Sequence, residues 1–175
     1  MMPGGGPSVH ASAVLVGDRA VLIRGPSGSG KSRLAFDLIL AGRSGQIPPA
    51  VLVGDDRVHL EAKQGQIVVR PAPELAGLIE IRGLGIRRCG FVGEAVVGLV
   101  VDLWAADAER LPVPEALLTR IHGVQLPRIP VEASYAALPL VAAAMTTTVS
   151  SDRAQPSGDC LKGIGNHIVP SIATE

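Results

Sequence analysis

The chain has 175 residues, of which 47% are hydrophobic and 18% are charged. This length fits one domain of ordinary size, and the apolar content can fill a core, which excludes a chain disordered throughout. The 16 basic and 16 acidic side chains cancel, so no long-range field attracts a nucleic acid or an anionic membrane. We therefore expect neither as a partner, although backbone amides can still bind an anion locally.

The N-terminal residues, the apolar segments and the cysteines indicate the cellular location of the protein. Residues 1–8 are rich in glycine and proline and lack the basic and apolar regions of a signal peptide. The apolar window Ala95–Leu103 is too short to cross a bilayer. Cys89 and Cys160 lack a metal-binding spacing, so we expect two reduced thiols. Together these features predict a cytoplasmic protein.

Turn signals and apolar runs predict an order of strands and helices. In chain order we expect a hairpin of Ser12–Val16 and Ala20–Arg24 around Gly17-Asp18, a helix from Lys31 to about Gly42, a buried strand Ala50–Val53, a hairpin of Arg57–Leu60 and Ile67–Arg70, a strand Leu78–Ile81, a buried strand Ala95–Leu103 and a helix Tyr135–Met145.

This mixture of strands and helices indicates an α/β fold with a mixed sheet and more hairpins than a doubly wound protein has. We expect a flexible N-terminus over residues 1–8, one domain over 9–145, and a poorly ordered tail over 146–175, where serine, threonine, glycine and proline dominate without periodicity.

The strongest motif is Gly25-Pro26-Ser27-Gly28-Ser29-Gly30-Lys31-Ser32, which matches the P-loop pattern GxxxxGK[ST]. Its glycines allow successive backbone N–H groups to converge on phosphate oxygens, and the helix that begins at Lys31 directs its positive end at the same anion. In such loops the lysine contacts the β- and γ-phosphates and the serine hydroxyl binds Mg²⁺. The motif predicts a nucleotide-binding or phosphate-binding site.

Two carboxylates follow the strand Ala50–Val53 directly. Asp55 and Asp56 would lie at the edge where open α/β sheets bind ligands. One could hold Mg²⁺ and its neighbour could accept a proton from an incoming hydroxyl. Because adjacent residues of a strand point to opposite faces, different roles are expected. A solvated turn is the alternative.

Four further charged residues have two interpretations. Glu80 and Arg82 belong to an apolar strand that enters a glycine-rich turn, and they are either on its solvent face or in a site. His10 precedes the first strand, and Arg110 lies in a polar stretch. From composition alone, solvated surface side chains are the simpler interpretation of both.

The order of these segments resembles the catalytic domain of bacterial HPr(Ser) kinase/phosphorylase. The matching parts are His10, the P-loop, Leu52-Val53-Gly54-Asp55-Asp56 and the signature Ile79-Glu80-Ile81-Arg82-Gly83-Leu84-Gly85-Ile86. The similarity covers roughly His10 to Met145, as in a short form without the family's N-terminal domain.

The resemblance implies a fold related to the nucleotide-binding part of phosphoenolpyruvate carboxykinase. It also implies an enzyme that uses ATP and Mg²⁺ to phosphorylate a serine of HPr, the phosphocarrier of the phosphotransferase system, and so regulates carbohydrate metabolism. Many members also reverse the reaction by phosphorolysis, and many are hexamers.

The resemblance assigns a role to each matching residue. It implies catalytic roles for His10, Lys31, Asp55 and Arg110, with Asp55 as the base in phosphorylation and the acid in the reverse direction. It implies metal binding by Ser32 and Glu80, and we add Asp56 as a further candidate metal ligand because of its position beside Asp55.

Two segments differ from the family pattern. Where the family has a proline- and arginine-rich loop used in dephosphorylation, Ile129-Pro130-Val131 continues into Glu132-Ala133-Ser134-Tyr135 without arginine, and the segment after Met145 replaces a C-terminal helix. Two alternatives therefore stay open. One is a regulatory module that binds ATP without transferring phosphate, and the other is a P-loop kinase for a small metabolite.

Overall fold

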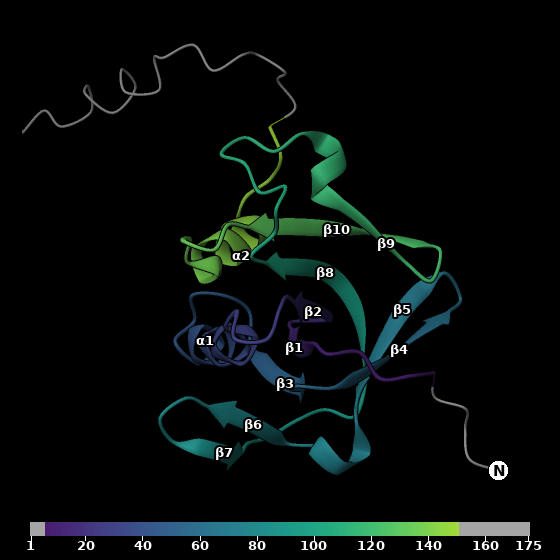
Figure 1. Cartoon of the computed structure of the whole chain (residues 1–175), viewed down its shortest axis with the longest axis vertical. Coiled ribbons are helices and arrows are strands. Elements are labelled where there is room, and N and C mark those ends of the chain that lie inside the picture. The colour runs from purple at the N-terminus through teal and green to yellow at the C-terminus, as the bar shows by residue number, and fades with distance from the viewer. Residues whose placement is uncertain (1–5, 151–175) are drawn as a thin grey trace, which may run out of the picture.

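The computed structural model describes residues 6–150 of the chain (Figure 1). The described elements are β1 (Ser12–Val16), β2 (Arg19–Arg24), α1 (Lys31–Arg43), β3 (Ala50–Gly54), β4 (Val58–Lys63), β5 (Gln66–Pro71), the 3₁₀ turn η1 (Pro73–Leu75), β6 (Leu78–Ile81), β7 (Gly85–Arg88), β8 (Ala95–Leu103), the 3₁₀ turn η2 (Pro114–Leu117), β9 (Leu118–Ile121), β10 (Val124–Val131) and α2 (Ala137–Thr146).

The main sheet has the strand order β3-β1-β2-β8-β10-β9, and β5, paired with β4, joins it at the start of β8. β1 is antiparallel to both β2 and β3, whereas β8 is parallel to both β2 and β10. The carboxyl ends of β3, β2, β8 and β10 therefore meet at one edge of the sheet, together with the amino end of β1. This edge carries the candidate site.

Both faces of the sheet are covered by other elements, which is why its central strands are unbroken apolar runs and not alternating ones. On one face, Ile23 and Leu52 belong to a core completed by the apolar residues of α1 and by Val141 of α2. On the other face, Leu22 and Val53 pack with residues of β5 and the β9–β10 hairpin. Figure 1 shows α1 and α2 together on one side of the strands, with β4–β5 on the other side. Successive residues of one strand thus pack into two different cores, one on each face of the sheet.

Most predicted elements are confirmed, including the two hairpins, the helix after the P-loop and the strand Ala95–Leu103. The helix predicted over Tyr135–Met145 begins two residues later, at Ala137. The sequence did not predict β7, β9 or β10. β10 contains two prolines, which usually argue against a strand because proline lacks the backbone N–H. Pro130 is tolerated because β9 pairs only with the first half of β10, so that Pro130 has a partner strand, β8, on one side only.

Several expectations concern residues outside the described part. Only residues 146–150 of the predicted tail are described, and Cys160 and residues 1–5 lie outside. Cys89 is a free thiol, and burial raises its pKa. No helix within residues 6–150 combines the length and hydropathy needed to cross a membrane.

Candidate phosphate-binding active site

The P-loop (Gly25–Ser32) connects β2 to α1 at the edge of the sheet. Gly25, Gly28 and Gly30 have φ values of 153°, 80° and 95°, which residues with a Cβ rarely adopt. Gly30 is the N-cap of α1, where no side chain caps the helix and no acidic residue occupies the first turn. The free N–H groups of this turn are therefore available to an anion such as phosphate.

The first glycine of the loop lies directly against the end of β8. A Cβ placed on Gly25 would come within 3.0 Å of the Leu103 backbone oxygen and within 2.6 Å of the Ser29 hydroxyl. That hydroxyl is buried, and it has no hydrogen-bond partner among residues 6–150. The loop thus has a fixed, tightly packed shape, and it presents a polar atom that a polar ligand could satisfy.

Lys31 lies within the loop and is only 6% exposed. Its ammonium group donates hydrogen bonds to the Gly25 carbonyl at 2.9 Å and to the Pro26 carbonyl at 3.0 Å. Burial lowers the pKa of Lys31, and the charges of Asp55 and Asp56 partly offset that effect. The lysine is thus held over the loop glycines, where a P-loop lysine meets phosphate oxygens.

Asp55 lies beneath the P-loop and is 2% exposed. Its Oδ1 accepts hydrogen bonds from the hydroxyls of Ser12, at 2.5 Å, and Ser32, at 2.9 Å. Its Oδ2 accepts one from the backbone N–H of Glu80 at 3.1 Å. The carboxylate therefore connects β1, α1 and β6 to the end of β3. In P-loop proteins, the pairing of a loop hydroxyl with a buried aspartate is the arrangement that holds Mg²⁺.

Asp56 faces the opposite way from its neighbour. Its backbone is left-handed, with φ 65°, and its side chain is 61% exposed. Its Oδ1 lies 3.1 Å from Nε2 of His10, which is placed at this edge because it precedes β1. The structure thus brings His10 and Asp56 together, and it separates the two adjacent carboxylates into a buried one and an accessible one.

Residues 27–32 of the P-loop line a cavity of about 990 Å³ at the edge of the sheet together with His10 and Asp56, whereas the buried Asp55 is not part of its wall. One end is charged and contains His10, Asp56, Glu80 and Arg82, and the P-loop forms the middle. The walls that follow β8 and β10 contribute Trp104 and Tyr135. Sequence reasoning assigned no role to either aromatic residue, and it left Arg82 undecided. Only the tertiary structure shows that these three residues share one cavity with the P-loop.

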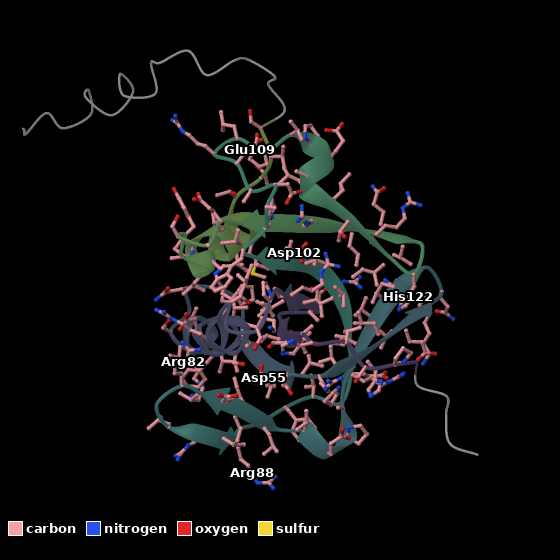
Figure 2. The ribbon with its side chains drawn as sticks, viewed as in Figure 1. Asp55, Arg82, Arg88, Asp102, Glu109 and His122 are labelled. Carbon is pink, nitrogen blue, oxygen red and sulfur yellow. The ribbon has the colours of Figure 1, made fainter. Side chains whose placement is uncertain are left out.

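The structure does not bring Arg110 into this cavity. Arg110 is exposed in the loop between β8 and η2, and it is absent from the cavity wall. In Figure 2 its neighbour Glu109 lies at the end of the molecule away from Arg88. The loop contains Pro112, and the Asp107–Arg128 ion pair of 2.7 Å fixes it to β10.

The residues present fit a magnesium–nucleotide complex. Within the described part of the chain, no three His, Cys, Asp or Glu side chains are grouped to hold a metal on their own. Mg²⁺ is usually bound by one or two protein oxygens together with substrate phosphates and water. Ser32 and Asp55 supply such oxygens beside the P-loop, and Glu80 lies on the cavity wall next to them.

The mixed sheet, the P-loop at the meeting strand ends and the aspartate under its serine define a P-loop phosphate-binding domain. Residues 6–160 match the family model of the HPr Serine kinase C-terminal domain, and the chain belongs to this family. The family resemblance and the α/β fold predicted from the sequence are therefore confirmed.

Relatives and a solved structure agree with this assignment. The chain is 40% identical over 101 residues to the HPr kinase/phosphorylase of Mycoplasma mycoides subsp. mycoides SC, covering 54% of this chain and 30% of that protein. It is 37% identical over 134 residues to that of Geobacillus thermodenitrificans, covering 70% of this chain and 41% of the relative. The chain thus spans less than half the length of either protein.

The fold resembles the solved structure of the Hpr(Ser) kinase/phosphatase from Coxiella burnetii. The two have a TM-score of 0.63 and 24% sequence identity, over 78% of this chain and 87% of the other.

Proposed function

We propose that this protein transfers the γ-phosphoryl group of ATP, bound with Mg²⁺, to a serine hydroxyl of an HPr-type phosphocarrier protein. One arrangement carries the proposal. Beside the P-loop, Asp55 binds the Ser32 hydroxyl, while Asp56 and His10 pair within the cavity. The site therefore has a place for the phosphates and an accessible acid–base pair beside them. The family and the relatives named HPr kinase/phosphorylase support the choice of substrate.

In the proposed reaction the serine oxygen forms a bond to the γ-phosphorus, and the bond from that phosphorus to the β,γ-bridging oxygen breaks, which releases ADP. The serine proton passes to a carboxylate in the cavity. The loop amides and Lys31 neutralise the phosphate oxygens, since phosphoryl transfer depends mainly on positioning and electrostatic stabilisation. Bound Mg²⁺ would add positive charge on the β- and γ-oxygens.

The geometry supports an exchange of the roles first expected for the two aspartates. Asp55 was expected to be the base, but it is buried and already accepts three hydrogen bonds. Asp56 was expected to bind metal, but it is accessible and pairs with His10. We therefore assign Asp56, with His10, to accept the serine proton, and Asp55, with Ser32, to the metal side. Glu80 retains its proposed role as a metal ligand.

Other expectations from the family resemblance stay predictions. These are the reverse phosphorolysis, the homo-oligomer or hexamer, the cytoplasmic location and the catalytic role of Arg110. Incubating the phosphoserine carrier with inorganic phosphate tests phosphorolysis, and sedimentation tests assembly. Loss of transfer in Arg110→Ala, with ATP binding retained, would show that the loop after Trp104 brings this arginine to the substrate.

The decisive experiment is a transfer assay with Mg·ATP and an HPr protein from the same cell, read by intact mass. We expect one added phosphate, and none on a carrier whose acceptor serine is changed to alanine. Lys31→Ala should abolish transfer, because the buried ammonium group at the loop is lost. Lys63→Ala, which removes an exposed lysine at the end of β4, is the matched control.

The other outcomes identify the alternatives. Tight ATP binding without transfer to the carrier would contradict the proposal and favour the regulatory module. Transfer to a small hydroxylated metabolite, but not to the carrier, would favour the metabolite kinase. Normal transfer by Lys31→Ala would contradict the assignment of the site.

A further inference from the structure

The order of the strands gives the cavity a direction. From β3 through β1 and β2 to β8 and β10, the sheet edge presents in turn the two aspartates, His10, the P-loop, Trp104 and the segment before α2. Strands in a sheet are about 4.8 Å apart, so the aspartates and Trp104 lie on opposite sides of the P-loop. The cavity includes wall residues from both sides.

This order sets the direction in which a nucleotide would lie, if the proposed function holds. Ser32 donates a hydrogen bond to Asp55 on the β3 side of the loop, and this pair would hold the metal that neutralises the β- and γ-phosphates. His10 and Asp56, which would meet the acceptor, are on that side too. The γ-phosphate therefore points towards β3. The α-phosphate and the nucleoside must then extend in the other direction, towards β8 and β10.

Trp104 is the large aromatic residue at the end of β8. It is the single tryptophan of the chain, and its side chain is on the cavity wall although the residue is 48% exposed. Its backbone is left-handed, with φ 57°, a conformation that is unusual for a bulky residue and often marks ligand sites. The preceding residue, Leu103, lies against Gly25 of the P-loop. Trp104 is thus held at a fixed place beside the phosphate-binding loop.

We propose that the indole of Trp104 stacks on the base of the bound nucleotide and forms the base subsite of this site. An exposed aromatic face next to a phosphate site suits a purine, because every base has a π-face that stacks on aromatic side chains. Tyr135, which follows β10 and also lines the cavity, is the second aromatic group on this wall. The inference rests on the proposed function, since it assumes that the P-loop holds a nucleoside triphosphate.

A comparison of two ligands tests the base subsite separately from the phosphate site. Calorimetry would measure the dissociation constants of Mg·ATP and Mg·tripolyphosphate, which share the phosphate chain but not the base. We expect Trp104→Ala to weaken ATP binding roughly tenfold while tripolyphosphate binding stays within about twofold. Trp104→Phe should keep most of the ATP affinity, because it retains an aromatic face.

Two further variants serve as controls. Trp104→Leu keeps apolar bulk without a π-face and should lose ATP affinity as the alanine variant does. It can therefore test the stacking role if the alanine variant does not fold. Val113→Ala truncates an exposed side chain of the same loop, outside the cavity wall, and should bind both ligands as the wild type does.

Each remaining outcome overturns the proposal. Equal weakening of both ligands in the Trp104 variants would mean that the residue only supports the loop. Unchanged ATP affinity would mean that the base lies elsewhere, and the proposed function would stand in that case. If wild-type protein binds neither ligand, the proposed function fails together with this inference.

Discussion

Arg24 and Asp102 are 78 positions apart in the sequence, yet they lie opposite each other in the parallel pair β2–β8 and form two hydrogen bonds of 2.7 Å. Arg24 is the last residue before the P-loop, and Asp102 is two residues before Trp104. Asp102 also accepts a hydrogen bond from Arg128 of β10, at 2.5 Å. One carboxylate therefore joins β2, β8 and β10, the strands from which the cavity walls extend.

The first prediction concerns the stability that this carboxylate provides. Burial raises the pKa of Asp102, but the hydrogen bonds and charges of Arg24 and Arg128 outweigh burial and hold it below its usual value. Asp102→Asn removes the counter-charge of Arg24 and one of the two carboxylates that pair with Arg128, which keeps Asp107. We expect the free energy of unfolding at pH 7 to fall by about 2 kcal/mol, less than for a fully buried pair because Arg24 is one-third exposed.

The pH dependence of the unfolding free energy tests whether the charge of Asp102 is the cause of this loss. Because the folded pKa of Asp102 is depressed, its contribution is complete above the unfolded pKa of about 3.9 and is lost as the pH falls through the folded pKa. The wild type and Asp102→Asn should therefore approach each other in urea unfolding as the pH is lowered below about 4. Glu61→Gln, in an exposed pair with Arg70, should unfold nearly as the wild type does. A difference that stays constant with pH would contradict the electrostatic account.

The second prediction separates the two neighbouring aspartates. In Asp55→Asn an amide replaces a carboxylate that accepts from two hydroxyls and one N–H, and at least one of these donors loses its partner. We expect a loss of about 1–3 kcal/mol in stability, together with weaker Mg²⁺ dependence of ATP binding. In Asp56→Asn, stability and ATP affinity should stay near those of the wild type, while kcat falls by about 10² or more.

Thermal unfolding, calorimetry and the transfer assay together distinguish these variants. If Asp56→Asn transfers phosphate normally while a folded Asp55→Asn binds Mg·ATP but does not transfer it, the catalytic role that the family resemblance implies for Asp55 would hold instead.

The third prediction concerns the packing of Gly25. In Gly25→Ala a methyl group must fit at φ 153° within 3.0 Å of the Leu103 carbonyl, so the loop has to move. We expect tripolyphosphate binding to weaken at least tenfold, as measured by calorimetry, because several converging N–H groups would be displaced. Gly65→Ala, at φ 75° in open space, is the matched control. It should lower stability by about 1 kcal/mol without changing phosphate affinity.

The fourth prediction compares two arginines of the β6–β7 hairpin. Arg82 lines the charged end of the cavity, whereas Arg88 is exposed and outside its wall (Figure 2). We expect Arg82→Ala to lower kcat/KM of transfer by about 10² because a positive charge near the transferring group is lost, and Arg88→Ala to change it less than about twofold. Equal losses in both variants would indicate a role of the hairpin in docking the carrier instead.

Much of the site follows from local sequence. The spacing of Gly25, Gly30, Lys31 and Ser32 predicts the phosphate-binding loop, because the glycine conformations and the start of the helix are marked by neighbouring residues. The apolar run of β8 and the strand before Asp55 were equally clear, since a strand buried on both faces needs an unbroken apolar segment. These parts indicated the fold class, whereas the family resemblance depended also on His10 and on the signature Ile79–Ile86.

Other features were decided by contacts between distant segments. Asp55 is buried because Ser12, Ser32 and Glu80, which lie 43, 23 and 25 positions away, each donate a hydrogen bond to it. Asp56 turns outward through a left-handed backbone that no sequence pattern marks. The sequence by itself thus predicted the kind of ligand, a phosphate group, for which the loop is suited. The tertiary structure decided which carboxylate and which aromatic residue line the cavity, because the meeting of strand ends depends on the pairing order of the whole sheet.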